Sequence, residues 1–580
     1  MPLDAFTLPA DDSARLNLLL NSNEPPNSLD IGLITSSIGL LDQSLFYLQT
    51  TLKRFKQERL RYKSLLCGVR KLPPEILSEI FVLCTELPPT IETRDESCVV
   101  YPDTTDYPYY LSQVCRRWRD IAHSTPLLWS SISLPHSAST LSRRYDDMIQ
   151  RCLNLSRQLP LHITITTPSW RKNDLDRMPE ILDRLSNSLM QLTTQMSRWR
   201  YFEFSSFAFG VDMAAKFFPV IPPSGAPNLI EAYFSDWHHQ DGASEAAKWM
   251  VEFLKAAPNI RHVEFNTLVP SLKTPDGVLW AHLRVFEAQN GMQIDDLFIV
   301  LMSCPSLETL DVNLDTRVDD PYTLELEKEI CLEKLQTLTL ACIRQDQLPI
   351  ILQWLTLPAL QRLSLEGAGE MLDDDWPHDQ FMGLLSRSKC TLEALILRDL
   401  SFTETQLISY LQLPNIRDTI QVLEIDQWRT AMSPDLLHML TFRFPPIPPP
   451  LTLPPPSPRI LFLPKLKDIT FTINAMVQAV SLRHFVASRW YARNDVPPPV
   501  ACLKRIRVYL AVPYVPNVEL AIGPIERVFT RIANGYGRNT GQRTVVELMR
   551  HVIRSGLQDQ EVYDGIERLD RLPISEWMIG

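Results

Sequence analysis

The sequence predicts an α/β protein in which N-terminal helices precede a long array of strand-plus-helix repeats. Three observations predict this fold class. A heptad pattern of apolar residues runs over 30–70, two amphipathic helices are indicated within 71–135, and an apolar-x-x-apolar-x-apolar pattern recurs through 136–524. With 580 residues, of which 45% are hydrophobic, the chain can bury a core of this extent. Residues 1–29 are expected to form a flexible tail.

The heptad segment predicts one long helix. Its apolar residues alternate four-residue and three-residue spacings, and Arg59 interrupts the register only once. These residues are Ile34, Ile38, Leu41, Leu45, Leu48, Leu52, Phe55, Tyr62, Leu66 and Val69. Between Lys53 and Lys63 the solvent side is mostly basic, which offers few Glu–Lys pairs across a dimer seam. A coiled-coil homodimer and a helix folded back on its own chain both remain open.

The first helix of 71–135 begins at Pro73 or Pro74. A fixed φ and a missing amide are tolerated in the first helical turn, and Glu75 suits the positive end of the helix. This helix carries two parallel apolar rows, namely Ile76, Ile80 and Leu83 beside Leu77, Phe81 and Cys84. A helical unit this small cannot bury both rows internally. One row is therefore expected to face a partner or another part of the chain.

The second helix follows an insert at about 85–110 that is rich in Thr, Asp, Pro and Tyr. Its apolar side consists of Leu111, Val114, Cys115, Trp118, Ile121 and Ala122, and its polar side of Arg116, Arg117, Arg119 and Asp120. Pro126 marks the end of the helix, and a short apolar run with Trp129 follows it. Two short helices and this tryptophan would make a small core.

This pattern resembles the F-box, in its fungal F-box-like form. The residues that match are Leu72-Pro73-Pro74-Glu75-Ile76-Leu77, Val114-Cys115-Arg116-Arg117-Trp118-Arg119 and Pro126 through Trp129, about a tenth of the chain with the segments between them. The resemblance implies that the unit binds a Skp-type adaptor, which links it to a cullin and RING ubiquitin ligase, while the rest of the chain selects the substrate. The residues that it implies for adaptor binding are Leu72, Pro73, Pro74, Ile76, Leu77, Ile80, Phe81, Leu111, Val114, Cys115, Trp118 and Trp129.

The alternative is a repeat scaffold for protein–protein interaction that is unconnected with ubiquitin. The helical unit would then cap the repeats or seat the heptad helix. The apolar rows distinguish the two interpretations, because a docking unit leaves some of these side chains exposed whereas a cap buries all of them. The side chains in question are Ile76, Leu77, Ile80, Phe81 and Trp118.

The repeats within 136–524 lie mostly about 23 to 32 residues apart, near the period of leucine-rich repeats. They begin at Trp199, Leu229, Ile260, Leu283, Leu307, Leu335, Leu360, Leu392, Ile420, Leu466 and Leu503. A proline ends the preceding helix in several of them, and helical segments such as 246–256 lie between the strands. One strand and one helix per repeat predict an irregular leucine-rich-repeat-like solenoid, whose concave strand surface would hold a target protein.

Two further segments complete the organisation. The proline-rich stretch 445–458 is expected to be an exposed loop, and a docking segment for proline-recognising domains is the alternative. Within the C-terminal 525–580, the spacing of Val545, Leu548, Met549 and Val552 predicts an amphipathic helix that caps the solenoid.

Composition excludes several classes of protein. The net charge of −11 argues against general binding to nucleic acid or anionic membranes, which needs clustered Lys and Arg. Ten cysteines without a Cys-x-x-Cys pair predict reduced and mostly buried thiols. No signal sequence and no apolar run of about 18 to 20 residues is found, so a cytoplasmic or nuclear protein without a membrane segment is expected.

Motifs for catalysis and metal binding are weak. The common phosphate loop, dinucleotide turn, nucleophile elbow and zinc-helix motifs do not occur. Ser386-Arg387-Ser388-Lys389 matches Ser-x-x-Lys without its partner motifs and is interpreted as surface. His238-His239 with Asp241, and Asp373-Asp374-Asp375, lack the spacing of metal sites. We therefore expect a non-catalytic protein without a cofactor.

Overall fold

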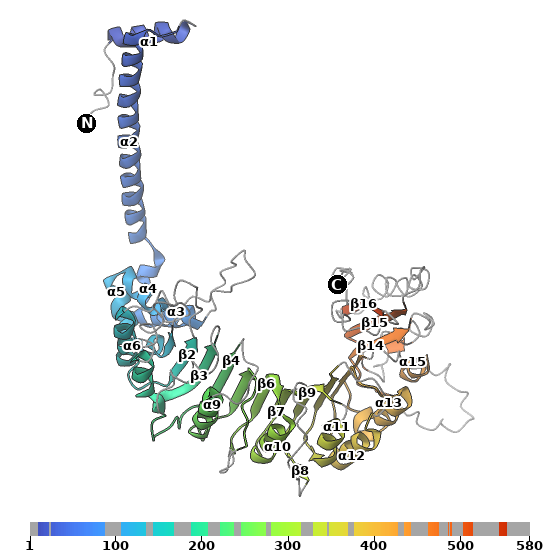
Figure 1. The fold of residues 1–580 in the computed structure, drawn as a ribbon. Coiled ribbons are helices and arrows are strands. Elements are labelled where there is room, and N and C mark those ends of the chain that lie inside the picture. Colours follow the sequence, from blue (N-terminus) through green and yellow to red (C-terminus); the bar gives the residue numbers. More distant parts are fainter. Residues whose placement is uncertain are drawn as a thin grey trace.

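The computed structural model describes residues 10–22, 25–86, 106–134, 143–166, 187–206, 221–236, 245–273, 280–314, 329–344, 347–368, 376–426, 434–441, 462–474, 485, 488–489, 501, 503–513 and 545–553. The protein is mixed α/β and is built on a large parallel sheet (Figure 1). The predicted proline-rich loop lies outside the described residues, as do His238-His239, Asp241 and the aspartate triplet.

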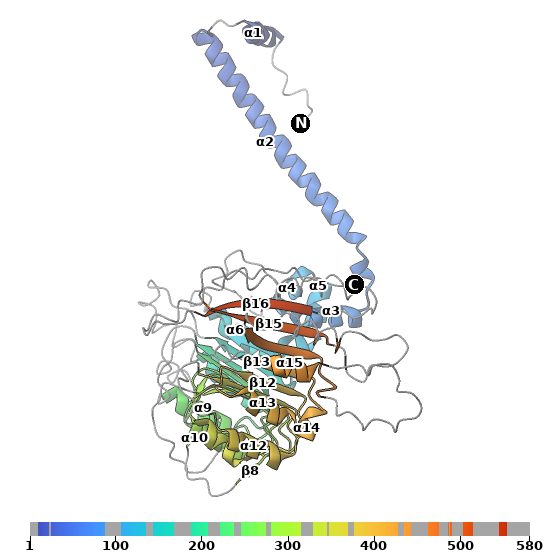
Figure 2. The same cartoon turned by 90° about the vertical axis from the view of Figure 1, so that its right-hand side faces the viewer.

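Two helices precede the body of the molecule. Helix α1 spans Ala10–Asn21 and lies in the segment predicted to be a flexible tail, and helix α2 spans Ser28–Leu65. The Asn27 side chain accepts from the first amides of α2, and Asp30 accepts from the Asn27 N–H, so both partners of a capping box are present. The Arg15 Nε donates to Asp30 at 2.7 Å and links the two helices. Figures 1 and 2 show α2 projecting away from the rest of the molecule, with α1 at its far end.

The long helix ends five residues earlier than predicted. Its C-cap is Leu66, and a 3-10 turn, η2, spans Gly68–Lys71. A glycine lowers helix stability, because it loses more backbone freedom than any other residue. The heptad residue Val69 therefore lies beyond the helix.

Four short elements follow. Helix α3 spans Pro74–Glu86, α4 spans Asp106–Val114, α5 spans Arg116–His123 and the 3-10 turn η3 spans Pro126–Trp129. The predicted second helix is thus two helices, because Cys115 between them is extended (φ −162°, ψ 170°). Its Sγ accepts from the Trp118 N–H at 3.4 Å and caps α5. The predicted insert is shorter than expected at both ends, and 87–105 lie outside the described residues.

The sheet contains fourteen described strands in the order β1-β2-β3-β4-β5-β6-β7-β9-β11-β12-β13-β14-β15-β16, with parallel pairing of neighbours. Their bounds are β1 Ser131–Leu134, β2 Leu161–Thr166, β3 Trp199–Ser206, β4 Glu231–Asp236, β5 His262–Asn266, β6 Val285–Met292, β7 Thr309–Leu314, β9 Thr337–Ile343, β11 Arg362–Gly367, β12 Ala394–Arg398, β13 Val422–Asp426, β14 Asp468–Asn474, β15 Arg505–Pro513 and β16 Val545–Ile553. A separate pair joins β8 (Ile330–Cys331) to β10 (Leu355–Thr356). Apart from this pair, strands that follow each other in the chain are neighbours, as in a solenoid.

Helices connect many of these strands. They are α6 Arg143–Leu155, η5 Met196–Arg198, α9 Glu245–Lys255, α10 Ile294–Ser303, α11 Gln347–Trp354, α12 His378–Ser388, α13 Glu404–Leu411, α14 Pro414–Arg417 and α15 Pro434–Leu440. Figure 1 shows a curved sheet with α9, α10, α12 and α13 along its outer side. The predicted helix at 246–256 corresponds to α9.

The apolar triplets set the register of the sheet. The second apolar residue of each repeat pairs with the second apolar residue of the next, for example Leu310 with Leu338 and Leu363 with Leu395. This row is at most 1% exposed and consists of Phe202, Ala232, Val263, Phe286, Leu310, Leu338, Leu363, Leu395, Leu423, Ile469 and Ile506. Each of the eleven predicted triplets lies at a strand of the one sheet. A shift of one residue would turn this row to the other face, which explains why the register is kept.

Three strands differ from the prediction. Strands β1 and β2 precede the first predicted repeat, so the sheet begins inside 71–135. Strand β16 replaces the predicted C-terminal helix and pairs with the whole of β15. The apolar residues of β16 fit both the helical period and the period of two, and its four β-branched residues at the ends favour a strand. The rest of 525–580 lies outside the described residues.

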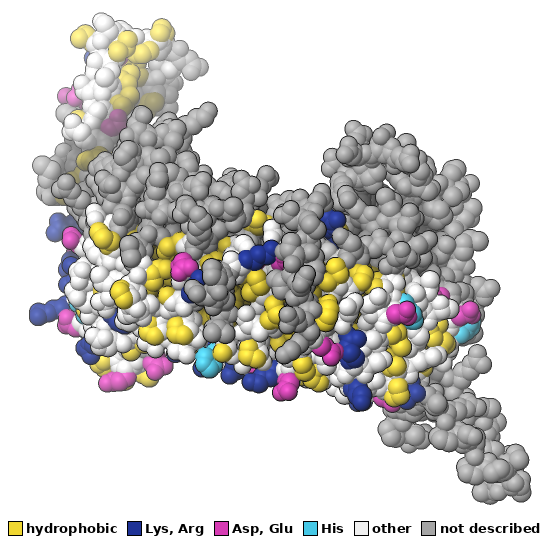
Figure 3. Space-filling view, turned by 60° about the horizontal axis from the view of Figure 1, so that its bottom comes forward, with side chains coloured by type: hydrophobic (Ala, Val, Ile, Leu, Met, Phe, Trp, Pro, Cys, Tyr) yellow, Lys and Arg dark blue, Asp and Glu magenta, His cyan; other side chains and the backbone are white. Residues whose placement is uncertain are grey.

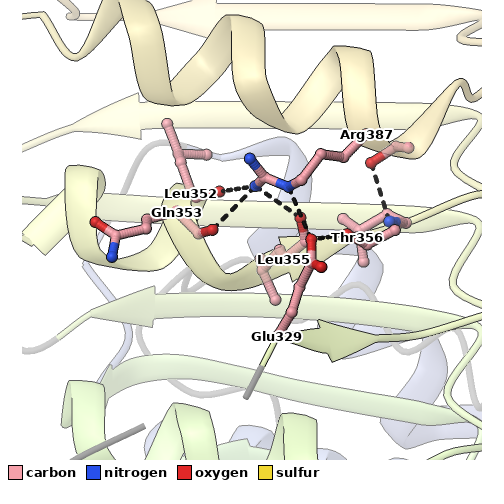
Figure 4. Close-up of polar contacts among 8 residues, drawn as sticks. Glu329, Leu352, Gln353, Leu355, Thr356 and Arg387 are labelled. Atoms are coloured by element: carbon pink, nitrogen blue, oxygen red, sulfur yellow. Dashed lines mark hydrogen bonds and ion pairs between the residues drawn. The ribbon is translucent and has the colours of Figure 1, made fainter. Parts of the chain in front are cut away.

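Arginines close the ends of neighbouring helices. The Nη2 of Arg387, on α12, donates to the carbonyl oxygens of Leu352 and Gln353 at 2.8 and 3.0 Å, at the end of α11 (Figure 4). It also donates to the carbonyl of Leu355 at 3.0 Å, and its Nε lies 2.9 Å from a carboxylate oxygen of Glu329. The last carbonyls of a helix have no partner within the helix and carry a partial negative charge, so a guanidinium stabilises them.

The neighbouring Ser388 is buried, whereas the other three residues of the Ser-x-x-Lys match, Ser386, Arg387 and Lys389, are exposed as predicted. Ser388 is 4% exposed, and its Oγ accepts from the Leu357 N–H at 3.0 Å.

A second arginine of this kind is almost fully buried. Arg489 is 2% exposed and donates to the carbonyls of Leu440, Leu463 and Phe462 at 2.9, 2.7 and 2.7 Å. Burial lowers the pKa of Arg489 to about 10, so it stays charged at neutral pH. It joins the end of α15 to the segment before β14.

Asp296 gives the fold a pH dependence. It lies in the first turn of α10, is 0% exposed, and accepts from the Leu272 N–H at 2.7 Å. Burial raises the pKa of Asp296 from 3.8 to about 6. Because the folded-state pKa is the higher one, the stabilisation from this carboxyl is complete only below about pH 4 and is lost as the pH rises through about 6.

We therefore expect Asp296→Asn to raise the melting temperature at pH 8, by an amount that shrinks towards pH 5. The asparagine keeps an acceptor for Leu272 but cannot ionise, and the pKa shift corresponds to about 3 kcal/mol at most. Differential scanning calorimetry from pH 5 to 8 measures the difference, with the exposed Asp120→Asn as control. A difference that stays constant with pH would contradict this assignment.

Candidate docking site

The two apolar rows of α3 lie in opposite environments. Leu77 and Phe81 are each 1% exposed, whereas Ile76, Ile80 and Leu83 are 47%, 39% and 56% exposed. The Phe81 ring packs on Trp118 of α5 with centroids 4.8 Å apart. The exposed three are spaced four and three residues apart and share one face of the helix. α3 thus presents an apolar row to solvent.

Two neighbouring elements add exposed apolar side chains. On α4 they are Tyr110 (62%) and Val114 (59%), and on η3 Leu127 (53%). We call Ile76, Ile80, Leu83, Tyr110, Val114 and Leu127 the docking residues. In the described chain after η2, the only other large apolar side chains with comparable exposure are Met190 and Met302. Six of eight such side chains therefore belong to one group of short helices, which is typical of an interaction surface.

Trp129 packs in the core between these helices and the sheet. It is 0% exposed and its Nε1 donates to the Ala122 carbonyl at 2.8 Å. The rings of Tyr109 and His123 pack on it edge-on with centroids 5.2 and 5.6 Å away. Trp129 is followed directly by β1, so the support of the docking helices and the first strand are one continuous segment.

Two arginines hold the helices in place, although the sequence indicated only a solvent-facing side. Arg117 donates to the carbonyls of Arg70 and Leu72 and thereby fixes the chain just before α3. Arg119 donates through Nε to the Ser112 carbonyl at 3.0 Å and joins α5 to α4. Both contacts are to backbone groups, which no spacing rule of side chains reveals.

The twelve residues predicted for adaptor binding fall into three groups. Pro73, Pro74, Ile76, Ile80, Val114 and Cys115 are exposed. Leu72, Leu111 and Trp118 are partly buried and pack on the core. The remaining three are Leu77, Phe81 and Trp129, which lie in the core and offer no surface to a partner, so their prediction as contacts is corrected. Leu83, Tyr110 and Leu127 are exposed instead, and Leu83 continues the row of Ile76 and Ile80.

The core beneath the docking residues is continuous with that of the sheet. Leu77, Phe81 and Trp129 belong to the same cluster of buried side chains as Ile132 of β1 and Ile163 of β2. One hydrophobic core therefore extends across the predicted domain boundary near residue 135.

The heptad row of α2 is exposed from Ile38 onward, whereas Ile34 is partly buried. Ile38, Leu41, Leu45, Leu48, Leu52 and Phe55 are 51–68% exposed. Among the described residues, this exposure differs from the alternative in which the helix folds back on its own chain.

The length and composition of the long helix bear on the predicted absence of a membrane segment. Within Ser28–Lys71 one 18-residue window has a mean hydropathy of 1.3, so by length and composition alone the helix could cross a membrane, contrary to that prediction. A single helix of this kind near the N-terminus is weak support for a membrane span.

Charges and cysteines are scattered. Figure 3 shows one face of the molecule on which Lys and Arg are interspersed with Asp and Glu.

All eight described cysteines are free. Cys152, Cys304 and Cys390 are buried as predicted, and burial raises their thiol pKa to about 12, 12 and 11, whereas Cys67, Cys115 and Cys331 are exposed.

No protein-family model matches this sequence, and no curated protein matches it significantly. The candidate site accordingly depends on its geometry and on the F-box-like residues themselves.

Proposed function

We propose that this protein is the substrate-recognition subunit of a Skp/cullin/F-box ubiquitin ligase. The docking residues bind a Skp-type adaptor, and the repeats, which we assign to an irregular leucine-rich-repeat type, bind a target protein for ubiquitin-dependent degradation. The chain is then a receptor without catalytic activity or cofactor, and it acts in the cytoplasm or nucleus.

One observation carries this proposal, namely the division of α3 into a buried row and an exposed row. If α3 only capped the repeats, both rows would be buried. Exposing three large apolar side chains to water is unfavourable, and only binding to a partner would remove them from water. The exposed row begins at Ile76, inside the Leu-Pro-Pro-Glu-Ile-Leu segment that resembles the F-box.

The repeat surface supports the second half of the proposal. On several strands the side chains opposite the core row are only partly buried, as at Thr309 and Asp311 of β7 and Thr337 and Thr339 of β9. Parallel neighbours place such positions side by side about 4.8 Å apart, which makes a long surface of adjacent polar groups. This is the kind of surface with which a solenoid binds another protein.

Co-purification with a Skp-type adaptor tests the proposal. We expect the double variant Ile76→Asp, Ile80→Asp to weaken adaptor binding at least about 100-fold, because each aspartate would place a charge in the apolar centre of the interface. The fold should persist, since both side chains are more than a third exposed. Circular dichroism and thermal melting verify this.

The matched control is Met190→Asp, Met302→Asp, which places the same charges at side chains of 51% and 48% exposure far from the docking residues in sequence. It should bind like the wild type. If the folded wild type does not bind the adaptor, or if both double variants bind equally well, the proposed function is wrong.

A further inference from the structure

A row of three carboxylates crosses adjacent strands of the sheet. Glu264 on β5 pairs with Glu287 on β6, which in turn pairs with Asp311 on β7. Like charges directly opposite each other destabilise a sheet. This part of the strand surface would gain stability from a cation.

A histidine lies beside this row with a defined tautomer. His262 precedes Glu264 by two residues on β5, so both side chains lie on the same face. The Tyr233 hydroxyl lies 3.1 Å from His262 Nδ1 and 3.1 Å from a carboxylate oxygen of Glu231. An ionised carboxylate only accepts, so Tyr233 donates to Glu231 and accepts from the Nδ1–H of His262. In the neutral imidazole the lone pair is then on Nε2.

The Nε2 of His262 is directed at the carboxylates. It is buried, has no hydrogen-bond partner in the described part of the chain, and lies 3.8 Å from a carboxylate oxygen of Glu287. Two acceptors that face each other in this way need a proton or a metal ion between them. Histidine ligands of metals commonly donate from their other ring nitrogen to a polar group, as His262 does to Tyr233.

The geometry points to a binding site for one divalent first-row transition-metal ion, held by His262 Nε2 and by carboxylate oxygens of Glu264 and Glu287. The three ligand atoms all lie within 4.8 Å of one another. Metal–ligand bonds of about 2.0–2.2 Å need ligand atoms about 3.3 Å apart, which small rotations of the two glutamates supply. One imidazole and two carboxylates suit zinc or manganese, and water or a target side chain would complete the coordination. Because the site lies on the strand surface, it does not depend on adaptor docking.

Titration of the purified full-length chain with Co²⁺ and back-competition with Zn²⁺ test this site. We expect one equivalent to bind with visible ligand-field bands and without the near-ultraviolet thiolate charge transfer that the exposed cysteines would produce. His262→Ala and Glu287→Gln should each weaken binding more than about tenfold, and Tyr233→Phe should weaken it about tenfold through loss of the orienting contact.

Two further measurements separate metal binding from folding. Glu287→Gln removes a like-charge contact, so it should lose the metal without a lower melting temperature. The control His162→Gln changes a histidine on β2 that stacks on Tyr201, with ring centroids 5.7 Å apart, and should leave binding unchanged. Absence of binding at micromolar Co²⁺ and Zn²⁺, or full binding by His262→Ala, overturns the proposal. In that case a proton lies between Nε2 and Glu287.

Discussion

Replacement of Trp129 by alanine is expected to destabilise the protein by about 3–5 kcal/mol and to abolish adaptor binding. The indole is fully buried and touches Tyr109 and His123, so its removal leaves a cavity. It also removes the indole donor of the Ala122 carbonyl, which is left with the Thr125 N–H at 3.2 Å. Since one core joins the docking helices to β1 and β2, we expect the helices and the first strands to lose structure together.

Urea denaturation followed by circular dichroism measures the loss of stability, and adaptor co-purification measures the loss of docking. The matched control is Leu127→Ala, in the same 3-10 turn but 53% exposed, which should change stability by less than about 0.5 kcal/mol. Leu127 is a docking residue, so its variant should weaken adaptor binding without unfolding. A Trp129→Ala variant as stable as the wild type would contradict the shared core.

Arg489→Ala is the second change with a large expected effect, about 3 kcal/mol or more. The variant removes the guanidinium donor from three backbone carbonyls, of which that of Leu463 keeps the Leu466 N–H at 3.3 Å, and water cannot easily replace the guanidinium in this buried position. Arg489→Lys should restore only part of the lost stability, because the single nitrogen of an ammonium group cannot reach the three carbonyl oxygens that the planar guanidinium contacts with separate nitrogens. Urea denaturation of the full chain measures both variants.

Arg387→Ala provides the comparison for Arg489. Its guanidinium also donates to three carbonyls, yet its side chain is 33% exposed, so water can take over part of its role. We expect a loss of only about 1 kcal/mol, in line with half-exposed hydrogen bonds. Equal losses for the two arginines would show that burial does not set the size of the effect.

The strands could be predicted because one physical requirement repeats along the chain. Each repeat must bury three apolar side chains, two on alternate residues of the strand and one three residues before them. The apolar triplet is therefore present in each repeat although the residue type varies, for example from Phe202 to Ala232. The start of α3 was equally predictable, because proline fixes the backbone locally. By contrast, β16 has an apolar pattern that fits two periods, so the periodicity alone did not identify the strand that pairs with β15.

Half of the docking residues, namely Ile76, Ile80 and Val114, could be predicted from the sequence, together with others that proved to be buried. Leu77 and Ile76 are equally apolar, and which of them is exposed depends on where Trp118 and Trp129 pack, which sequence spacing does not contain. The break at Cys115 likewise depends on a cap made by a thiol, a weak acceptor that is rarely used there. His262 and Glu287 meet only through strand register, so no motif joins them.

The chain-order pairing of strands has a consequence for how the protein folds. Nearly every strand pairs with the next one in the chain, so only a few tens of residues separate the two strands of each pair. The entropy lost on closing such a short loop is small. Such topologies can nucleate at one repeat and propagate to the next, without waiting for distant segments to meet. During synthesis α3, α4 and α5 emerge before the strands, and β1 and β2 can pack on these helices while later repeats are still being made. These helices and the first two strands would then be the first part of their shared core to acquire structure.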